Sequence, residues 1–151
     1  MPFLGTFEYQ MDDRNRIALP PEFREEFEAG AVMTTGTEPC VLVYTPGGFD
    51  RAAAAIEAIP DETEEGREAR RDFYSNAFKE KKDGQGRLLL RSRFISHAGL
   101  RKEVAVVGAG GWIEIWDRPT WEARAAERAA ARKAGLAGVA ARKSAQHGSG
   151  A

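Results

Sequence analysis

The sequence predicts a mainly β fold with helices, in which two tandem repeats of β-hairpin, helix and β-hairpin interleave into one barrel-like body. The first observation is a repeat: Asp12–Arg16 and its apolar strand Ile17–Leu19 return 71 residues later as Asp83–Arg87 and Leu88–Leu90. Turn chemistry, apolar strand and an Asp/Arg pair recur together, which indicates a duplicated module. The second observation is size, because one copy has too few residues to close a core and leaves its sheet edges open.

The repeat continues beyond this motif. Phe23 matches Phe94 at the same offset, and after a small gap and an insertion near Gly99 further pairs follow at an offset of 72. These pairs are Val32 with Val104, Gly36 with Gly108, Tyr44 with Trp116 and Phe49 with Trp121. We therefore expect module 1 at 6–50, a helical connector at 51–76, module 2 at 77–120, a C-terminal helix at 121–134 and a flexible basic tail at 135–151.

Each repeat is expected to open with a hairpin that has a polar tip. Phe3–Met11 alternates apolar and polar residues, as an extended segment does. Asn15 then suits a turn, since asparagine accepts positive φ, and Gly86 holds the equivalent place in the second copy. The returning strands, 17–19 and 88–90, are apolar.

A short helix is expected next in each repeat. Pro20-Pro21 suits a helix start, and Phe23 and Phe27 lie four residues apart on one face before Gly30 stops the helix. In the second copy Ser92 is the expected N-cap and Gly99 the stop.

Second hairpins and connecting helices complete the expected elements. The hairpins pair 31–35 with 41–44 and 104–107 with 113–116, across glycine-containing turns at 36–39 and 108–111. Residues 49–77 are expected to be helical with a break near Pro60, after which acidic residues 61–65 begin a second helix. Residues 118–134 suit another helix, and the Ala/Gly/Lys/Arg/Ser composition beyond it predicts a frayed or disordered tail.

Charge and composition limit the function classes. The net charge is −1, but residues 118–151 carry seven Lys/Arg against two Glu, so the tail is +5 and the remainder −6. An acidic body cannot bind nucleic acid by bulk attraction, so any DNA contact must come from local basic loops, the tail or many copies together. There is no membrane-length apolar stretch and no secretory signal, which predicts a cytoplasmic protein.

The isolated Cys and His residues predict no metal and no cofactor. Cys40 is the single cysteine, so it is expected to be an ordinary buried strand residue rather than part of a disulfide or a metal cluster. His97 and His147 have no nearby ligand or nucleophile set. The Gly108–Ile113 segment lacks the third glycine of a dinucleotide loop, which favours an ordinary turn.

These features together resemble one bacterial family. The opening Phe3-Leu4-Gly5, the two D-x-x-x-R motifs, the helix-stop glycines and the turn at 108–110 resemble MraZ, whose chains hold two SpoVT-AbrB-type modules. The resemblance covers roughly residues 1 to 125 and implies a double-split, swapped-hairpin β-barrel. This chain departs from the family pattern at Asn15, where glycine is usual, at Arg91, where proline is typical, and in its basic C-terminal extension.

The resemblance also implies a function. It implies a sequence-specific, DNA-binding transcriptional regulator of the division and cell-wall gene cluster, acting on short repeated boxes in its own promoter. Such a regulator assembles into a ring-like homo-oligomer and is associated with the nucleoid. Its expected DNA-contacting residues correspond here to Arg16 and Arg87.

The chemistry of the motif fits that expectation. The planar arginine fork can bind a guanine edge bidentately or clamp a phosphate, and Arg14, Lys82 and Gln85 lie at or beside the same tips. Asp12 and Asp83 repel phosphate, so their expected role is support, together with the turn residues Asn15 and Gly86. In the alternative interpretation, the Asp/Arg pairs serve only as surface salt bridges that stabilise the hairpins.

Two other function classes compete with the regulator. The same fold superfamily includes antitoxins, so an antitoxin-like partner binder is the alternative, with the tail folding on its partner. Two full modules in one chain favour the regulator. An enzyme is not expected, because the sequence offers no nucleophile–base pair, metal cluster or carboxylate pair.

Overall fold

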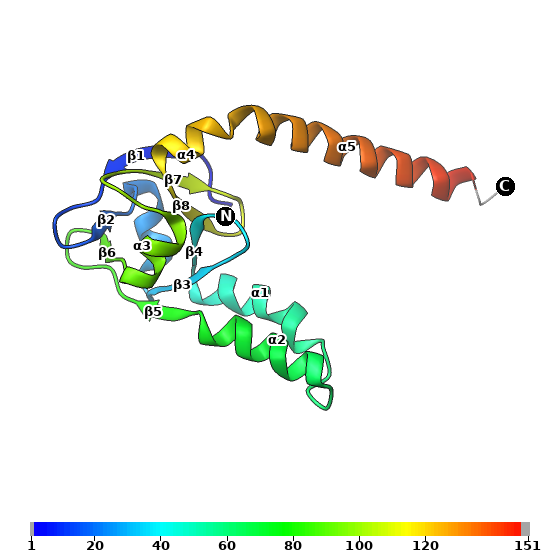
Figure 1. Ribbon diagram of the computed structural model, residues 1–151, viewed down its shortest axis with the longest axis horizontal. Coiled ribbons are helices and arrows are strands. Elements are labelled where there is room, and N and C mark those ends of the chain that lie inside the picture. Colours follow the sequence, from blue (N-terminus) through cyan, green and yellow to red (C-terminus); the bar gives the residue numbers. More distant parts are fainter. Residues whose placement is uncertain (1, 149–151) are drawn as a thin grey trace. The chain divides into compact units, whose positions relative to one another are not determined.

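The computed structural model describes residues 2–148, and the chain divides between Arg118 and Pro119 into two compact units. The first unit holds a six-stranded antiparallel sheet in the order β1-β7-β8-β4-β3-β5 and a two-stranded ribbon, β2-β6 (Figure 1). The strands are β1 (Thr6–Gln10), β2 (Arg16–Ala18), β3 (Ala31–Thr35), β4 (Cys40–Tyr44), β5 (Phe78–Glu80), β6 (Arg87–Leu89), β7 (Glu103–Gly108) and β8 (Ile113–Asp117). The helices are η1 (Pro21–Phe27, 3₁₀), α1 (Pro46–Glu57), α2 (Glu64–Ser75), α3 (Ser92–Ala98), α4 (Arg118–Ala123) and α5 (Ala125–Gly148).

The two repeats exchange strands with each other. The first strand of each copy pairs with the third strand of the other, so β1 pairs with β7 and β5 pairs with β3. The apolar return strands β2 and β6 pair together. The contacts are reciprocal, because the backbone N–H of Leu19 donates to the Gly86 carbonyl at 2.8 Å and that of Leu90 to the Asn15 carbonyl, also at 2.8 Å.

This exchange corrects the expected opening hairpin of each repeat. The turn closes, since Asp12 N–H donates to the Arg16 carbonyl and Asp83 N–H to the Arg87 carbonyl, but the two arms then separate. Beyond the turn Met11 donates to Lys102 of the other repeat, at 2.7 Å. Local turn chemistry therefore fixed the loop, while the partner of each arm was decided by long-range pairing. The second hairpins, β3-β4 and β7-β8, form as predicted.

One core lies between the sheet, the ribbon and the two short helices. It draws on both repeats, with Phe27, Phe94, Met33 and Leu88 almost fully buried. Phe3 joins it from the N-terminal segment, with its ring centroid 5.1 Å from Phe23 and 5.4 Å from Phe27. Each large apolar side chain buried in this way contributes about 1.5–3 kcal/mol. Because the core draws these side chains from both repeats, neither repeat has a core of its own.

The two short helices lie where the sequence predicts them. Phe23 and Phe27 of η1 are buried, and Gly30 (φ 109°) and Gly99 (φ 59°) adopt the positive φ of a helix stop. The predicted N-cap of the second helix is wrong. Arg91 is the extended N-cap residue and Ser92 is already helical, so the Ser92 side chain does not cap the helix.

The connector forms a helical hairpin, α1 and α2, broken at Pro60 as expected. Thr45 and Thr63 cap these helices, each hydroxyl oxygen accepting a hydrogen bond at 3.0 Å from the backbone N–H of Gly48 or Gly66. Glu64 and Glu65 lie in the first turn of α2, where the helix dipole stabilises a carboxylate. Cys40 is buried in β4, as predicted.

Helix content is higher than the sequence reading expected. A flexible tail was expected at 135–151, but α5 continues through Gly148, while 149–151 lie outside the described residues. Alanine has the highest helix propensity, and a run of it outweighs the cost of about 1 kcal/mol each for Gly135 and Gly138. With α1, α2 and α5, the protein is a mixed α/β fold rather than a mainly β one. No helix among residues 2–148 is long and apolar enough to cross a membrane.

Candidate nucleic-acid interface

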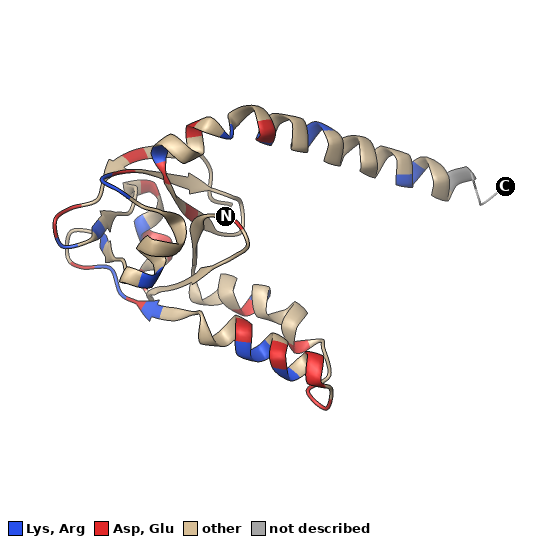
Figure 2. Ribbon diagram, in the orientation of Figure 1, with Lys and Arg blue, Asp and Glu red and all other residues tan. Residues whose placement is uncertain are grey.

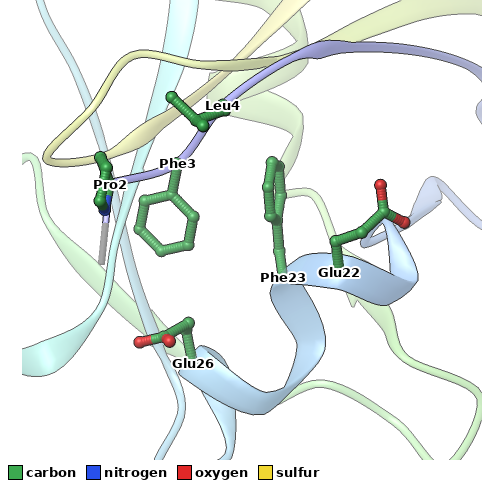
Figure 3. A pocket seen from close by; sticks show the side chains of 6 residues that line it. All are labelled: Pro2, Phe3, Leu4, Glu22, Phe23 and Glu26. Atoms are coloured by element: carbon green, nitrogen blue, oxygen red, sulfur yellow. The ribbon is translucent and has the colours of Figure 1, made fainter.

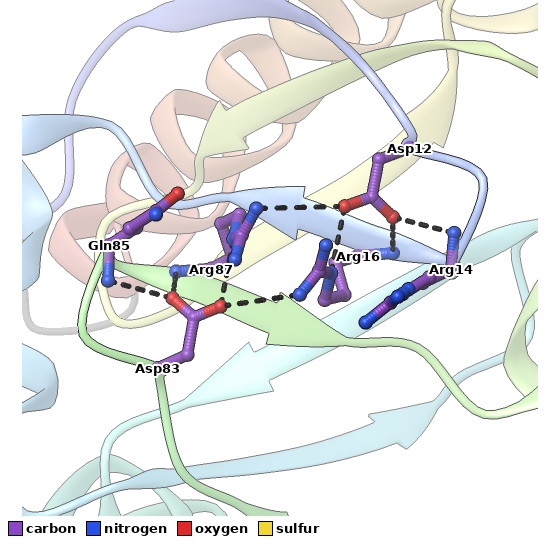
Figure 4. A network of polar contacts seen from close by, with 6 residues as sticks. All are labelled: Asp12, Arg14, Arg16, Asp83, Gln85 and Arg87. Atoms are coloured by element: carbon purple, nitrogen blue, oxygen red, sulfur yellow. Dashed lines mark hydrogen bonds and ion pairs between the residues drawn. The ribbon is translucent and has the colours of Figure 1, made fainter.

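The two D-x-x-x-R loops lie side by side at one end of the first unit, joined by the β2-β6 ribbon (Figure 4). In its register Arg16 lies opposite Leu89 and Ala18 opposite Arg87, with Ile17 and Leu88 paired between them. Ile17 and Leu88 are buried, whereas the arginine side chains keep 26% and 28% of their surface exposed. The ribbon thus anchors both loops in the core and leaves both arginines at the surface.

Each aspartate organises its own loop in the same way. One Asp12 carboxylate oxygen accepts the backbone N–H groups of Arg14 (2.9 Å) and Arg16 (2.8 Å), and the other accepts Nε of Arg16 at 2.8 Å. Asp83 repeats the pattern with Gln85 N–H, Arg87 N–H and Arg87 Nε, at 2.9, 2.9 and 2.8 Å. Asn15 (φ 58°) and Gly86 (φ 77°) supply the left-handed residue of each turn, as predicted.

The loops also contact each other through their charges. Nη1 of Arg16 lies 3.9 Å from Asp83, and Nη1 of Arg87 lies 3.9 Å from Asp12. Each guanidinium therefore lies between two carboxylates, one from each repeat. The four residues form a single reciprocal cluster with no net charge, built equally from both repeats (Figure 4).

Hydrogen bonds from these loops stabilise the ionised carboxylates. The backbone N–H of Arg87, followed by its side chain and the N–H of Gln85, lowers the pKa of Asp83 to about 2. The pKa of Asp12 is lowered in the same way, first by the Arg16 N–H and then by its side chain. Both carboxylates are therefore charged at neutral pH, where each can pair with its arginine.

The other predicted site residues separate into two groups. Arg14 and Gln85 occupy equivalent, exposed positions at the two tips, where each side chain is turned to solvent. Lys82 does not extend from its loop into solvent. Its Nζ pairs with Glu28 at 3.1 Å, and its side chain is only 19% exposed. Figure 2 shows acidic and basic residues intermixed along both loops, so this end of the molecule is not a uniformly basic patch.

One residue beside the cluster was missed by the sequence reading. Arg24, on η1, donates from Nε to the Leu19 carbonyl at 3.0 Å and lies against the Gly86 turn of the other repeat. Its counterpart at the 71-residue offset is Ile95, so the repeat itself did not point to it. The available signal was a lone cation within the acidic run 22–28.

The exchanged strands and reciprocal loops define a class of protein, a chain of two fused repeats whose equivalent Asp/Arg loops meet on a shared ribbon. Comparison with known proteins identifies the class. Residues 2–72 and 73–139 each match the family described as "MraZ protein, putative antitoxin-like". The chain belongs to the MraZ family, which comprises transcriptional regulators and not enzymes.

Curated relatives agree with this assignment. The chain is 40% identical over 129 residues to the "Transcriptional regulator MraZ" of Kocuria rhizophila, covering 85% of this chain and 90% of the relative. The protein of the same name from Clavibacter michiganensis subsp. michiganensis is 39% identical over 120 residues, covering 80% and 84%. That of Micrococcus luteus is 38% identical over 129 residues, covering 85% and 90%.

Proposed function

We propose that this regulator binds double-stranded DNA in a sequence-specific way through its two D-x-x-x-R loops, with Arg16 and Arg87 as the residues that contact the bases. The observation that carries the proposal is the reciprocal cluster of Arg16, Arg87, Asp12 and Asp83. It presents two arginines on one ribbon, which Ile17 and Leu88 anchor in the core. Arg14 and Gln85 would contact the DNA backbone or base edges around them, and Lys82 would do so only on leaving its ion pair with Glu28.

The way the arginines are held supports this role. Nε of each is bound to its own aspartate at 2.8 Å, and Nη1 is shared at 3.9 Å with the other aspartate. Both side chains keep part of their surface exposed, 26% for Arg16 and 28% for Arg87, so each guanidinium can still meet a ligand. A guanidinium held in this way loses little side-chain entropy on meeting a guanine or a phosphate.

Because the cluster carries no net charge, it favours sequence-specific DNA binding over non-specific attraction to phosphates. Non-specific DNA affinity rises with the number of phosphates that cations neutralise. Two arginines balanced by two aspartates add little to that term, whereas a bidentate guanine contact discriminates by about 1–3 kcal/mol. We therefore propose that single modules bind DNA weakly and that repeated promoter boxes bring several modules to one DNA.

We propose a ring-like homo-oligomer that presents many loops to repeated boxes upstream of its own division and cell-wall gene cluster, in the cytoplasm at the nucleoid. The strand exchange between repeats supports assigning the fold to the swapped-hairpin barrel, with module 1 at 6–50 and module 2 at 77–120.

A second candidate is an antitoxin-like partner binder. The description of the matched family favours keeping it, because it contains the words antitoxin-like. In that case the Asp/Arg cluster would serve only to stabilise the contact between the two repeats. Neighbouring genes distinguish the two candidates, since division and cell-wall genes downstream support the regulator and a small toxin gene supports the antitoxin.

The decisive experiment is fluorescence anisotropy on a duplex from the region upstream of the gene, against a scrambled duplex, across a salt series. The test variant is Arg16→Ala with Arg87→Ala. Arg91→Ala is the matched control, because it removes an arginine whose partner, Glu80 at 2.9 Å, lies outside the cluster. We expect tight binding that prefers the native duplex, weakens with salt and is lost only in the double variant.

The contrary result is equally clear. Equal, weak binding to both duplexes that the double variant leaves unchanged would limit the cluster to a structural role. Circular dichroism and denaturant unfolding of the double variant are needed alongside, because unfolding would also abolish binding. A variant that unfolds would support the interpretation that the Asp/Arg cluster has a purely structural role.

A further inference from the structure

An open apolar pocket lies on the first repeat (Figure 3). Its volume is about 320 Å³, with Phe3 and Phe23 inside and Pro2 and Leu4 at the edge. Leu4 is 69% exposed, which is unusual for a leucine beside a core. Glu22 and Glu26 flank the pocket, and neither carboxylate pairs with a cation among residues 2–148.

The second repeat carries different charges beside its equivalent ring pair. There Phe78 packs edge-on against Phe94, with ring centroids 6.0 Å apart, as Phe7 packs against Phe23 at 5.3 Å in the first repeat. The guanidinium carbons of Arg91 and Arg93 lie 4.2 and 5.0 Å from the Phe78 ring centroid. At the 71-residue offset these arginines correspond to Pro20 and Glu22. The first repeat therefore lacks these cations and has Glu22 and Glu26 beside its open apolar pocket.

Helix α5 carries the complementary surface. Arg132, Leu136, Val139 and Lys143 follow the spacing i, i+4, i+7 and i+11, which places them on one helix face. Leu136 and Val139 are 59% and 40% exposed. We call these four residues the α5 stripe: two aliphatic side chains between two cations.

We propose that the α5 stripe of one copy docks in the Phe3–Phe23 pocket of a second copy. Leu136 and Val139 enter the pocket, and Arg132 and Lys143 pair with Glu22 and Glu26. Apolar surface meets apolar surface and both charge signs are matched, which is what selects partners at an interface. This contact joins different surfaces of the two copies, so it propagates head to tail and can close a ring. It rests on the ring assembly proposed above.

Two other occupants fit less well. A second α5 would bring like charges together, because the helix carries Arg128, Arg132, Lys133, Arg142 and Lys143 against Glu127 alone (Figure 2). DNA phosphates would pair with the cations but would leave Leu136 and Val139 without an apolar partner. Of these three occupants, the pocket is the one that satisfies both parts of the stripe.

A charge exchange between full-length chains tests the proposal. The first variant is Glu22→Lys with Glu26→Lys, and the second is Arg132→Glu with Lys143→Glu. Alone, each variant opposes like charges at the contact, so its assembly should weaken about tenfold or more. Mixed together, the two variants restore both charge pairs in trans, and sedimentation velocity should show assemblies that contain both chains.

Matched controls make the same charge changes elsewhere. Lys133→Glu with Arg142→Glu alters α5 about a quarter turn to either side of the stripe, and Glu25→Lys with Glu62→Lys alters exposed sites outside the pocket. Both should assemble as the wild type does. Leu136→Ser should weaken assembly while Leu136→Met retains it, with helix content followed by circular dichroism.

Several results would overturn the inference. These are a monomeric wild type, variants that assemble normally when alone, or a mixture that does not reassemble. Loss of affinity for a duplex with one box in the α5 variant, with assembly unchanged, would instead assign the stripe to DNA. Binding to that single box through Arg16 and Arg87 is scored separately, so failure of the docking contact is distinguishable from failure of DNA reading.

Discussion

Arg24 of the first repeat lies against Gly86 of the second, so closely that a Cβ atom at residue 86 would be 2.4 Å from the Arg24 Nε. The same Nε donates to the Leu19 carbonyl at 3.0 Å, which holds the guanidinium over the turn. The first repeat has Asn15 at the equivalent turn position, and Ile95 corresponds to Arg24. Two turns of the same shape thus have different requirements for the residue in the left-handed position.

Gly86→Ala should destabilise the protein by about 1–2 kcal/mol, because an L-residue at φ 77° is strained and its Cβ displaces Arg24. Urea unfolding measures this free energy. Asn15→Gly is the matched control and should change stability by only a few tenths of a kcal/mol in either direction, because φ 58° suits both residues. Wild-type stability in Gly86→Ala would show that Arg24 does not restrict the turn.

Stability should fall in acid through the loop carboxylates. The pKa of Asp83 is about 2 in the folded protein and 3.8 ordinarily, so the ionised form favours folding. This contribution is fully present above about pH 4 and is lost as pH falls toward 2. The pKa of Asp12 is also lowered and acts in the same direction.

Asp83→Asn tests this pH dependence. In that variant the free energy of unfolding should vary less between pH 4 and pH 2 than in the wild type. Denaturant unfolding at a series of pH values gives the comparison, and Glu62→Gln, at an exposed site outside the loops, is the control. Equal slopes for Asp83→Asn and the wild type would show that the loop bonds do not hold the carboxylate ionised.

Replacing the arginines by lysine should separate the contribution of bidentate base contacts to DNA binding from that of positive charge. Arg16→Lys with Arg87→Lys keeps both positive charges but loses the planar fork. Discrimination between the native and scrambled duplex should fall by about 1–3 kcal/mol per lost bidentate contact, while the salt dependence of binding stays unchanged. Anisotropy titrations at several salt concentrations measure both. A variant that discriminates as well as the wild type would exclude bidentate base reading.

The shared core predicts one cooperative transition. Phe94 is fully buried, so Phe94→Ala should destabilise the protein by about 3–5 kcal/mol. Leu89, on the same repeat, is 49% exposed, so Leu89→Ala should cost only about 0.5 kcal/mol. Fluorescence and circular dichroism should show coincident unfolding of both repeats. Two separate transitions would mean that each repeat has an independent core.

Recognition of the elements from the sequence was uneven for physical reasons. The turns at Asn15 and Gly86, the helix stops and the break at Pro60 were predictable, since each depends on the local conformational preference of a few residues. The partner of β1 was not, because alternation shows that a segment is extended and not which strand it pairs with. The length of α5 was also missed, because its polar and small residues gave a disorder-like composition.

The candidate site shows the same division. The repeated motif by itself determined that Asp12, Arg16, Asp83 and Arg87 are equivalent in pairs and belong to turns, because turn chemistry is local. Only the tertiary structure decided that the two pairs form one reciprocal cluster, that Lys82 turns to Glu28 and that Arg24 covers Gly86. These contacts join residues far apart in the chain, and they exist because two incomplete repeats exchange strands to close a single core.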